Sequence, residues 1–212
     1  MKGLLSTLFG LTDEQAMWRV QTSDDSAAFE HLVRKWQGPI QRLCTRMTGS
    51  LHKGEDLAQE VFARLHARRE AYQPIGKFST YLWRMALNVS YDELRRVRRR
   101  PEGSLIDADD ESGDVLERNL VEERTPSDCA AATEAADRVQ AALAALPEHY
   151  RVVIVMRHYE GLKFQEIAEV LGIPEGTVKS RMAYGLKQLH SVLAPEFGPR
   201  GARSRTPESL VL

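Results

Sequence analysis

The chain has 212 residues, which allows one large domain or two small ones, and 42% of its residues are hydrophobic. Aromatic residues make up only 7% and charged residues 28%, which suits small helical domains better than a large sheet-based enzyme. The net charge of −1 hides an asymmetry, because residues 1–101 carry 17 basic against 11 acidic residues, whereas residues 102–140 carry 3 against 12.

The N-terminal segment, residues 1–22, is expected to be an extension that precedes the first domain. Its start, up to Leu11, is rich in apolar residues and faintly resembles a signal peptide. However, Asp13 and Glu14 follow at once and no small-residue cleavage site is evident. No apolar run in the chain is long enough to span a bilayer. We therefore expect a short amphipathic helix or a disordered extension, in a cytoplasmic protein.

Residues 23–101 show the apolar spacing of a helical domain. Ser23 or Asp24 is expected to cap the first helix, and Pro39 is expected to kink it or to lie near a break. This domain is predicted to contain three main helices in all.

Glycine and proline mark the connections between these helices. Gly49 and Gly54 are expected to bracket a short turn before the second helix, and residues 73–76 predict a loop before the third. The third helix ends in an arginine run, residues 95–100, and Pro101 stops it.

Residues 102–133 are predicted to be a flexible acidic linker. They are poor in large apolar residues and rich in Asp, Glu, Ser and Gly, so they cannot bury enough surface to offset the entropy of ordering. The C-terminal segment, residues 194–212, contains several prolines and glycines and is expected to be a disordered tail.

Residues 134–193 return to a helical pattern that ends in a helix-turn-helix. Pro147 suits the first turn of a helix that ends near Gly161. Gly172 lies between two short helices and can adopt the positive φ that a turn requires. The exposed N-terminal part of the second helix, where a recognition helix reads bases, then carries the candidate DNA-contacting residues Glu175, Thr177, Lys179, Ser180, Arg181 and Tyr184.

An ordinary helical hairpin with a glycine C-cap is the structural alternative to this helix-turn-helix. DNA binding is favoured because Ala168, which is small, Gly172 and the core residue Val178 fall in register. The expected fold class is all-α, with two small helical domains joined by a flexible acidic linker and a helix-turn-helix in the C-terminal domain.

Three segments resemble region four of the extracytoplasmic-function (ECF) subfamily of the sigma-70 family: residues 146–148, 161–168 and 172–181. In that family this domain binds the minus-thirty-five promoter element in the major groove. The resemblance covers about residues 24–101 and 134–193, in the family's order and spacing. It implies a sigma factor that directs RNA polymerase core to promoters and assists promoter melting.

Residues 56–62 resemble the region-two helix that docks on the β′ clamp helices of core polymerase, and the β subunit is a further expected contact. Asp56, Gln59, Glu60 and Ala63 share one face, and a polar, partly acidic face can complement a basic partner surface. The alternative is a solvated face of a surface helix.

Residues 78–88 resemble the promoter-melting segment, which in the family holds unpaired bases of the minus-ten element together with the loop before it. Aromatic residues stack on bases, basic residues hold phosphates, and a loop can pocket a flipped base. The residues expected to act here are Lys77, Phe78, Tyr81, Trp83, Arg84, Asn88, Arg95 and Arg96. The family often has tryptophan in place of Tyr81, and Tyr81 and Trp83 could instead be core residues. Which of the two contacts DNA is left open.

The resemblance also carries expectations for the basic run, the linker and regulation. Residues 95–100 are expected to contact phosphates, which position a protein without specifying sequence, although a solvated helix end is the alternative. The acidic linker either mimics nucleic acid in the polymerase channels or is only a tether. An anti-sigma factor, sometimes membrane-anchored, is an implied partner. A compact state of the two domains is also permitted, and their exposed core-binding faces could supply its interface.

No pattern in the sequence points to catalysis, a metal or a cofactor. The six histidines are scattered, and Cys44 and Cys129 are expected to be two separate reduced thiols. There is no nucleophile elbow or phosphate-cradling glycine loop, so we expect neither an enzyme nor a small-molecule substrate. The main alternative function is a helix-turn-helix regulator, such as a repressor or response-regulator output domain. It would leave residues 56–62 and 78–100 unexplained. A third possible function is that of an interaction protein that keeps the sigma fold but has lost promoter activity.

Overall fold

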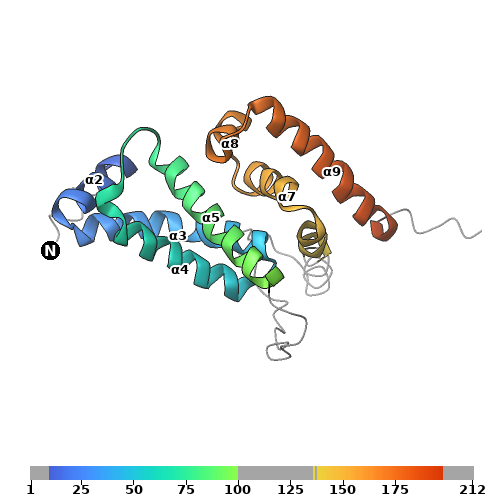
Figure 1. Ribbon diagram of the computed structural model, residues 1–212, viewed down its shortest axis with the longest axis horizontal. Helices are drawn as coiled ribbons and strands as arrows, with labels where there is room; N and C mark the ends of the chain where they lie inside the picture. Colours follow the sequence, from blue (N-terminus) through green and yellow to red (C-terminus); the bar gives the residue numbers. More distant parts are fainter. Residues whose placement is uncertain (1–9, 100–135, 137, 198–212) are drawn as a thin grey trace, which may run out of the picture.

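The structure is a computed structural model that describes residues 10–99, 136 and 138–197. In these ranges every regular element is helical. Figure 1 shows α2 to α5, in blue to green, as one bundle, with α7 to α9, in yellow to red, as a second group beside it. The expected all-α fold with two small helical domains is confirmed. The predicted acidic linker lies outside the described residues.

Helix α2 (Asp13–Ser23) belongs to the first domain rather than to a separate extension. Thr12 and Gln15 form a capping box at its start, with bonds of 3.2 and 3.0 Å. Its apolar face is fully buried against the rest of the bundle, through Ala16, Met17 and Val20. The first domain therefore begins before residue 23, where the sequence pattern had placed its start.

Helix α3 (Ser26–Thr48) is capped by Asp25, whose carboxylate accepts hydrogen bonds from the backbone of Ala27 and Ala28. The expected cap at Ser23 or Asp24 is wrong, because α2 extends through Ser23 and Asp24 closes it with a left-handed φ of 49°. The helix also continues through Pro39 without a break. The remaining elements of this domain are α4 (Leu51–Ala67), a 3-10 turn η1 (Arg69–Ala71) and α5 (Phe78–Arg99).

Gly54 is a packing position inside α4, although the sequence suggested that it ends a turn. The turn is made by Gly49 alone, with φ of 80°, and Ser50 caps α4. A Cβ at residue 54 would lie 2.0 Å from Thr45 Oγ1 and 2.8 Å from the Thr45 backbone nitrogen. The missing side chain therefore lets α3 and α4 approach closely.

Gly54→Ala is expected to lower the free energy of unfolding by about 1–3 kcal/mol, because the backbone of α3 has to move away from the added methyl group. Urea unfolding of the full chain measures the change. Gly38→Ala is the matched control inside α3, since its nearest neighbour is only the flexible end of Arg42 at 3.4 Å. The control should gain about 0.5–1 kcal/mol from helix propensity. Equal effects of the two substitutions would contradict the close-approach explanation.

The second domain is built from helical residues 138–145, α7 (Glu148–Ile154), a π-helical turn η2 (Val155–Tyr159), α8 (Phe164–Leu171) and α9 (Glu175–Phe197). Pro147 precedes α7, and Gly161 and Gly172 have the positive φ values of 70° and 65° expected at helix ends. Helix α9 continues through Pro195, past the expected end of the domain at Leu193. Residues 198–212 lie outside the described part of the chain.

The two domains pack against each other through α5 and α8 and through α3 and η2. Arg151 on α7 is buried, and its guanidinium donates to the backbone carbonyl of Met47 near the end of α3 and to those of Ala144 and Leu146 in its own domain. Gln140 adds a bond of 3.4 Å to the carbonyl of Thr45. A compact two-domain arrangement is therefore present.

Candidate polymerase and promoter interfaces

The predicted recognition helix is the N-terminal part of α9, which begins directly after the Gly172 turn. Val178 and Met182 are buried and hold this helix against the second domain. The candidate minus-thirty-five residues lie on its outer side: Glu175, Lys179, Ser180 and Tyr184 are exposed, whereas Thr177 and Arg181 are partly buried. Glu175 and Lys179 pair at 2.6 Å, one helical turn apart. The surface is therefore open, and its DNA contacts remain a prediction.

The predicted polymerase-docking face occupies the outer side of α4. Its members are all exposed: Asp56, Gln59, Glu60 and Ala63. The opposite face of the helix packs into the core through Leu57, Val61 and Leu65. The domains pack mainly through α3 and α5 on one side and α7, η2 and α8 on the other, and this face of α4 stays exposed. The expectation that core-binding faces supply the contact therefore does not hold for α4.

The predicted minus-ten segment divides into buried and exposed residues along α5. Phe78 is fully buried, with its ring 6.1 Å from Tyr72 and 6.4 Å from Trp36. It has no surface to offer to DNA in this structure and is corrected from a candidate DNA contact to a core residue. Trp83 is also buried at 5% exposure and packs edge-on against Trp36 at 5.7 Å.

Tyr81 is partly buried, with its ring 5.2 Å from that of Tyr72, so it is the more accessible of the two aromatic candidates in this arrangement. The polar candidates are exposed: Lys77, Arg84, Asn88, Arg95 and Arg96. Two of these already have acidic neighbours on α5, Arg96 with Glu93 at 2.6 Å and Arg95 with Asp92 at 3.6 Å. The Asp92 side chain is 59% exposed, whereas that of Glu93 is only 10% exposed.

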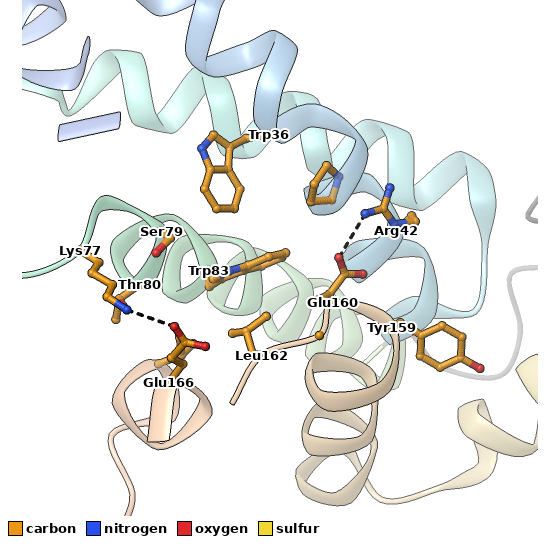
Figure 2. A pocket seen from close by; sticks show the side chains of 13 residues that line it. Trp36, Arg42, Lys77, Ser79, Thr80, Trp83, Tyr159, Glu160, Leu162 and Glu166 are labelled. Carbon is orange, nitrogen blue, oxygen red and sulfur yellow. Dashed lines mark hydrogen bonds and ion pairs between the residues drawn. The ribbon is translucent and has the colours of Figure 1, made fainter. Parts of the chain in front are cut away.

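A cleft of about 340 Å³ lies between the domains, beside the minus-ten segment. Figure 2 shows Trp36 and Trp83 on one side of it and Leu162 on the other, with ion pairs at its two ends. Lys77 Nζ lies 3.0 Å from Glu166 Oε1, and Arg42 Nη2 lies 3.3 Å from Glu160 Oε2.

Arg84 connects α5 directly to the helix-turn-helix. Its Nε donates to the carbonyl oxygen of Val170 at 3.1 Å and its Nη2 to that of Glu169 at 2.5 Å, at the C-terminal end of α8. A cation is well placed there, because the last carbonyls of a helix lack backbone partners. Lys77 and Arg84 therefore use for interdomain contacts the same donors that they would use for DNA phosphates.

Glu160 places a buried charge in the interdomain contact, with a side chain only 2% exposed. Arg42 lies 3.3 Å from its carboxylate and Arg46 4.0 Å, and Arg46 also covers the Tyr159 ring at 3.9 Å. Burial raises the pKa of Glu160 although both arginines act to lower it. Burial likewise lowers the pKa of Arg46, so for both groups the loss of water outweighs their attraction.

Sequence reasoning missed this interdomain set, which comprises Arg42, Arg46, Arg151 and Glu160. The one signal in the sequence is Arg46, which falls among the apolar residues of α3 and is 8% exposed. Its partner is more than a hundred residues away, so no local pattern identifies it.

Metal and membrane features are not found in the described part of the chain. No group of His, Cys, Asp and Glu there could hold a metal ion, and none of its helices is long and apolar enough to cross a membrane. Cys44 is buried, and burial raises the pKa of its thiol to about 11, so the group stays protonated. Cys129 lies outside the described residues.

Comparison with known proteins places both halves in one family. Residues 32–100 match Sigma-70 region 2, and residues 136–189 match Sigma-70, region 4. The ECF RNA polymerase sigma factor SigW of Bacillus subtilis is 34% identical over 172 residues, covering 80% of this chain and 90% of that protein. The chain belongs to the ECF sigma factors. The ECF RNA polymerase sigma-E factor of Escherichia coli K12 is 31% identical, covering 87% and 96%.

As an ECF sigma factor, the chain is a transcription initiation factor that directs RNA polymerase core to promoter DNA. Sigma factors are not known as enzymes. The alternative function, a stand-alone helix-turn-helix regulator, is not favoured, because the first domain matches Sigma-70 region 2 as well.

Solved structures show the same fold. CnrH, solved in complex with the cytosolic domain of CnrY, has a TM-score of 0.62 at 23% identity, covering 87% of this chain and 98% of that one. RpoE of Bartonella quintana, solved with the anti-sigma factor NepR, has a TM-score of 0.56 at 18% identity, covering 78% and 96%.

Proposed function

We propose that this sigma factor uses three separate surfaces: the exposed face of α4 for core polymerase, residues 73–77 with the exposed side of α5 for the minus-ten element, and the start of α9 for the minus-thirty-five element. The observation that carries this assignment is the separation of these surfaces. The docking face on α4 and the recognition residues on α9 are open, whereas α8 engages two basic residues of the minus-ten surface, Lys77 and Arg84.

The packed arrangement is, in this proposal, a state of the free chain that excludes minus-ten DNA. Arg84 and Lys77 cannot bind phosphates while they bind α8, so the domains have to separate before promoter melting. Because the α4 face remains exposed, core polymerase can dock first. Docking through α4 is open to both states, so the opening is driven by polymerase and promoter contacts that only the separated domains can make.

The proposal includes regulation by an anti-sigma factor, which the complexes of two structurally similar proteins support. RpoE of B. quintana was solved in complex with the anti-sigma factor NepR, and CnrH in complex with the cytosolic domain of CnrY. A partner of this kind would stabilise the packed state of this chain in the cytoplasm, or at the inner membrane when the partner is membrane-anchored. The proposal includes no catalytic step and no cofactor.

Glu60→Lys tests the docking surface. We expect affinity for core polymerase to fall by at least about tenfold, because a positive charge would face a basic partner surface. Glu30→Lys is the matched control, since Glu30 pairs with Arg34 at 2.6 Å on α3 in the same i,i+4 geometry in which Glu60 pairs with Arg64 at 2.5 Å on α4.

Run-off transcription with core polymerase on a promoter library, together with titration of core binding, gives both readouts. Equal core binding by the two variants would contradict docking through α4. If the unmodified chain binds core but yields no start-site-specific transcript, the assigned promoter surfaces are wrong.

A further inference from the structure

The loop formed by residues 73–77 has an open tip and two fixed ends. Ile75 at the tip is 85% exposed, and its backbone N–H donates to the carbonyl of Gln73 at 2.8 Å. The residues on either side of the loop are buried, Tyr72 at 3% exposure and Phe78 at 0%. The contacts that fix these two ends therefore also determine the position of the loop tip.

Gln21 of α2 holds the first end of the loop. Its side-chain Nε2 donates to the carbonyl oxygen of Glu70 at 3.0 Å and to that of Tyr72 at 2.9 Å. One amide group therefore uses both of its N–H donors on the backbone that leaves η1 and enters the loop.

Glu14 of α2 holds the second end. Its Oε1 accepts a hydrogen bond of 2.9 Å from the backbone N–H of Phe78, the first residue of α5. A helix start usually receives such a bond from its own N-cap side chain, which Lys77 cannot provide. The bond lowers the pKa of Glu14 below its ordinary value, so the acceptor stays ionised at neutral pH.

Glu14 and Gln21 are seven residues apart in α2, so they lie two turns apart on nearly the same face, about 10 Å along the axis. A single rigid helix thus fixes the separation of the two loop ends. Different contacts hold α2 itself on α3: the Asp13 carboxylate binds Lys35 Nζ at 2.7 Å and Trp36 Nε1 at 3.2 Å. Removing the loop contacts therefore need not undock the helix.

We propose that α2 positions the promoter-reading loop, and that Glu14 and Gln21 are positioning residues that determine specificity for a minus-ten base. The helix precedes residues 32–100, the segment that matches region 2. This inference rests on the proposed role of residues 73–77 in holding that base. Neither residue touches the DNA, because each acts on the backbone of the loop.

The test uses the full chain with core polymerase on promoters that carry each of the four bases at each minus-ten position. For the double variant Glu14→Ala with Gln21→Leu, the ratio of open-complex formation between the preferred and the other bases is expected to fall roughly five- to tenfold at the position held by the loop, at the lower end of the range that a single base contact provides. Ratios at the minus-thirty-five element should not change. Glu14→Gln keeps a neutral acceptor and should give an intermediate loss.

Asp13→Asn is the matched control, because it weakens the contact of α2 with α3 without touching the loop. It should leave the minus-ten ratios unchanged, and thermal unfolding reports on folding of every variant. An equal loss in the control would overturn the positioning role, because any weakening of α2 would then suffice.

Ile75→Ala separates this inference from the proposed function. If Ile75→Ala alters the minus-ten ratios and the double variant does not, then α2 has no positioning role, whereas the loop still reads a base. If Ile75→Ala and Lys77→Ala both leave the ratios unchanged, the loop does not read a base and both statements fail.

Discussion

Replacing Arg151 by methionine is expected to lower the free energy of unfolding of this sigma factor by about 3 kcal/mol. The guanidinium serves the carbonyl oxygens of Met47, Ala144 and Leu146, near the ends of two helices. Each carbonyl left without a donor costs about 1–3 kcal/mol. Part of the loss is offset, because methionine removes the cost of burying a charge, which is also what lowers the pKa of Arg151.

Urea unfolding measures this loss, and Arg157→Met is the graded control. Arg157 donates to one carbonyl, that of Leu162 at 3.0 Å, and lies 5.0 Å from the Phe164 ring, so we expect its removal to cost about 1 kcal/mol. Because Met47 belongs to the first domain, Arg151→Met should also loosen the packing of the domains and increase the radius of gyration. A loss no larger than that of Arg157→Met would contradict the three-carbonyl role.

The helix-turn-helix was predictable because local backbone requirements determine it. Gly161 and Gly172 do adopt positive φ, and Pro147 does precede a helix. A glycine at a left-handed turn leaves the same signal whatever packs against it. The same holds for the buried positions Val178 and Met182, which follow helical spacing.

Features that depend on distant partners were not predictable in this way. The pattern of residues 1–22 does not show that α2 packs into the first domain, since a short amphipathic helix can equally lie free. Gly54 looks like a turn residue until Thr45 is placed beside it. Phe78 and Trp83 have the apolar spacing of a core and the chemistry of a base-stacking site, and only the contact with Trp36 assigns them to the core.

Reversing the charge at Glu160 is expected to separate the two domains. Glu160→Lys would put a third positive charge beside Arg42 and Arg46 at a side-chain position only 2% exposed. In the separated state all three groups are hydrated, so the cost falls on the packed state alone. Breaking a buried pair costs about 3–5 kcal/mol, which lowers the ratio of packed to open molecules by a factor of roughly 10² to 4 × 10³.

Small-angle scattering should then show a larger radius of gyration for Glu160→Lys. Glu30→Lys, which reverses a charge in an exposed pair, should leave the radius of gyration unchanged. Adding Arg46→Glu to Glu160→Lys swaps the charges and should restore packing, and the double-mutant cycle measures the coupling. An unchanged radius for Glu160→Lys would contradict a role for this pair in packing.

The Glu160→Lys variant also tests whether packing of the domains blocks DNA binding. With Arg84 and Lys77 released from α8, the Glu160→Lys chain should bind single-stranded minus-ten DNA without core polymerase more tightly than the unmodified chain. Burial raises the pKa of Glu160 above its ordinary 4.5 in the packed state, so packing binds a proton. That contribution is fully present below the ordinary value and is lost as the pH rises through the packed-state pKa. Once the pH exceeds the packed-state pKa, the carboxylate is buried in its ionised form, and the cost of that burial offsets its attraction to the arginines. Opening then stays within reach of the energy gained from polymerase and promoter contacts that only the separated domains make.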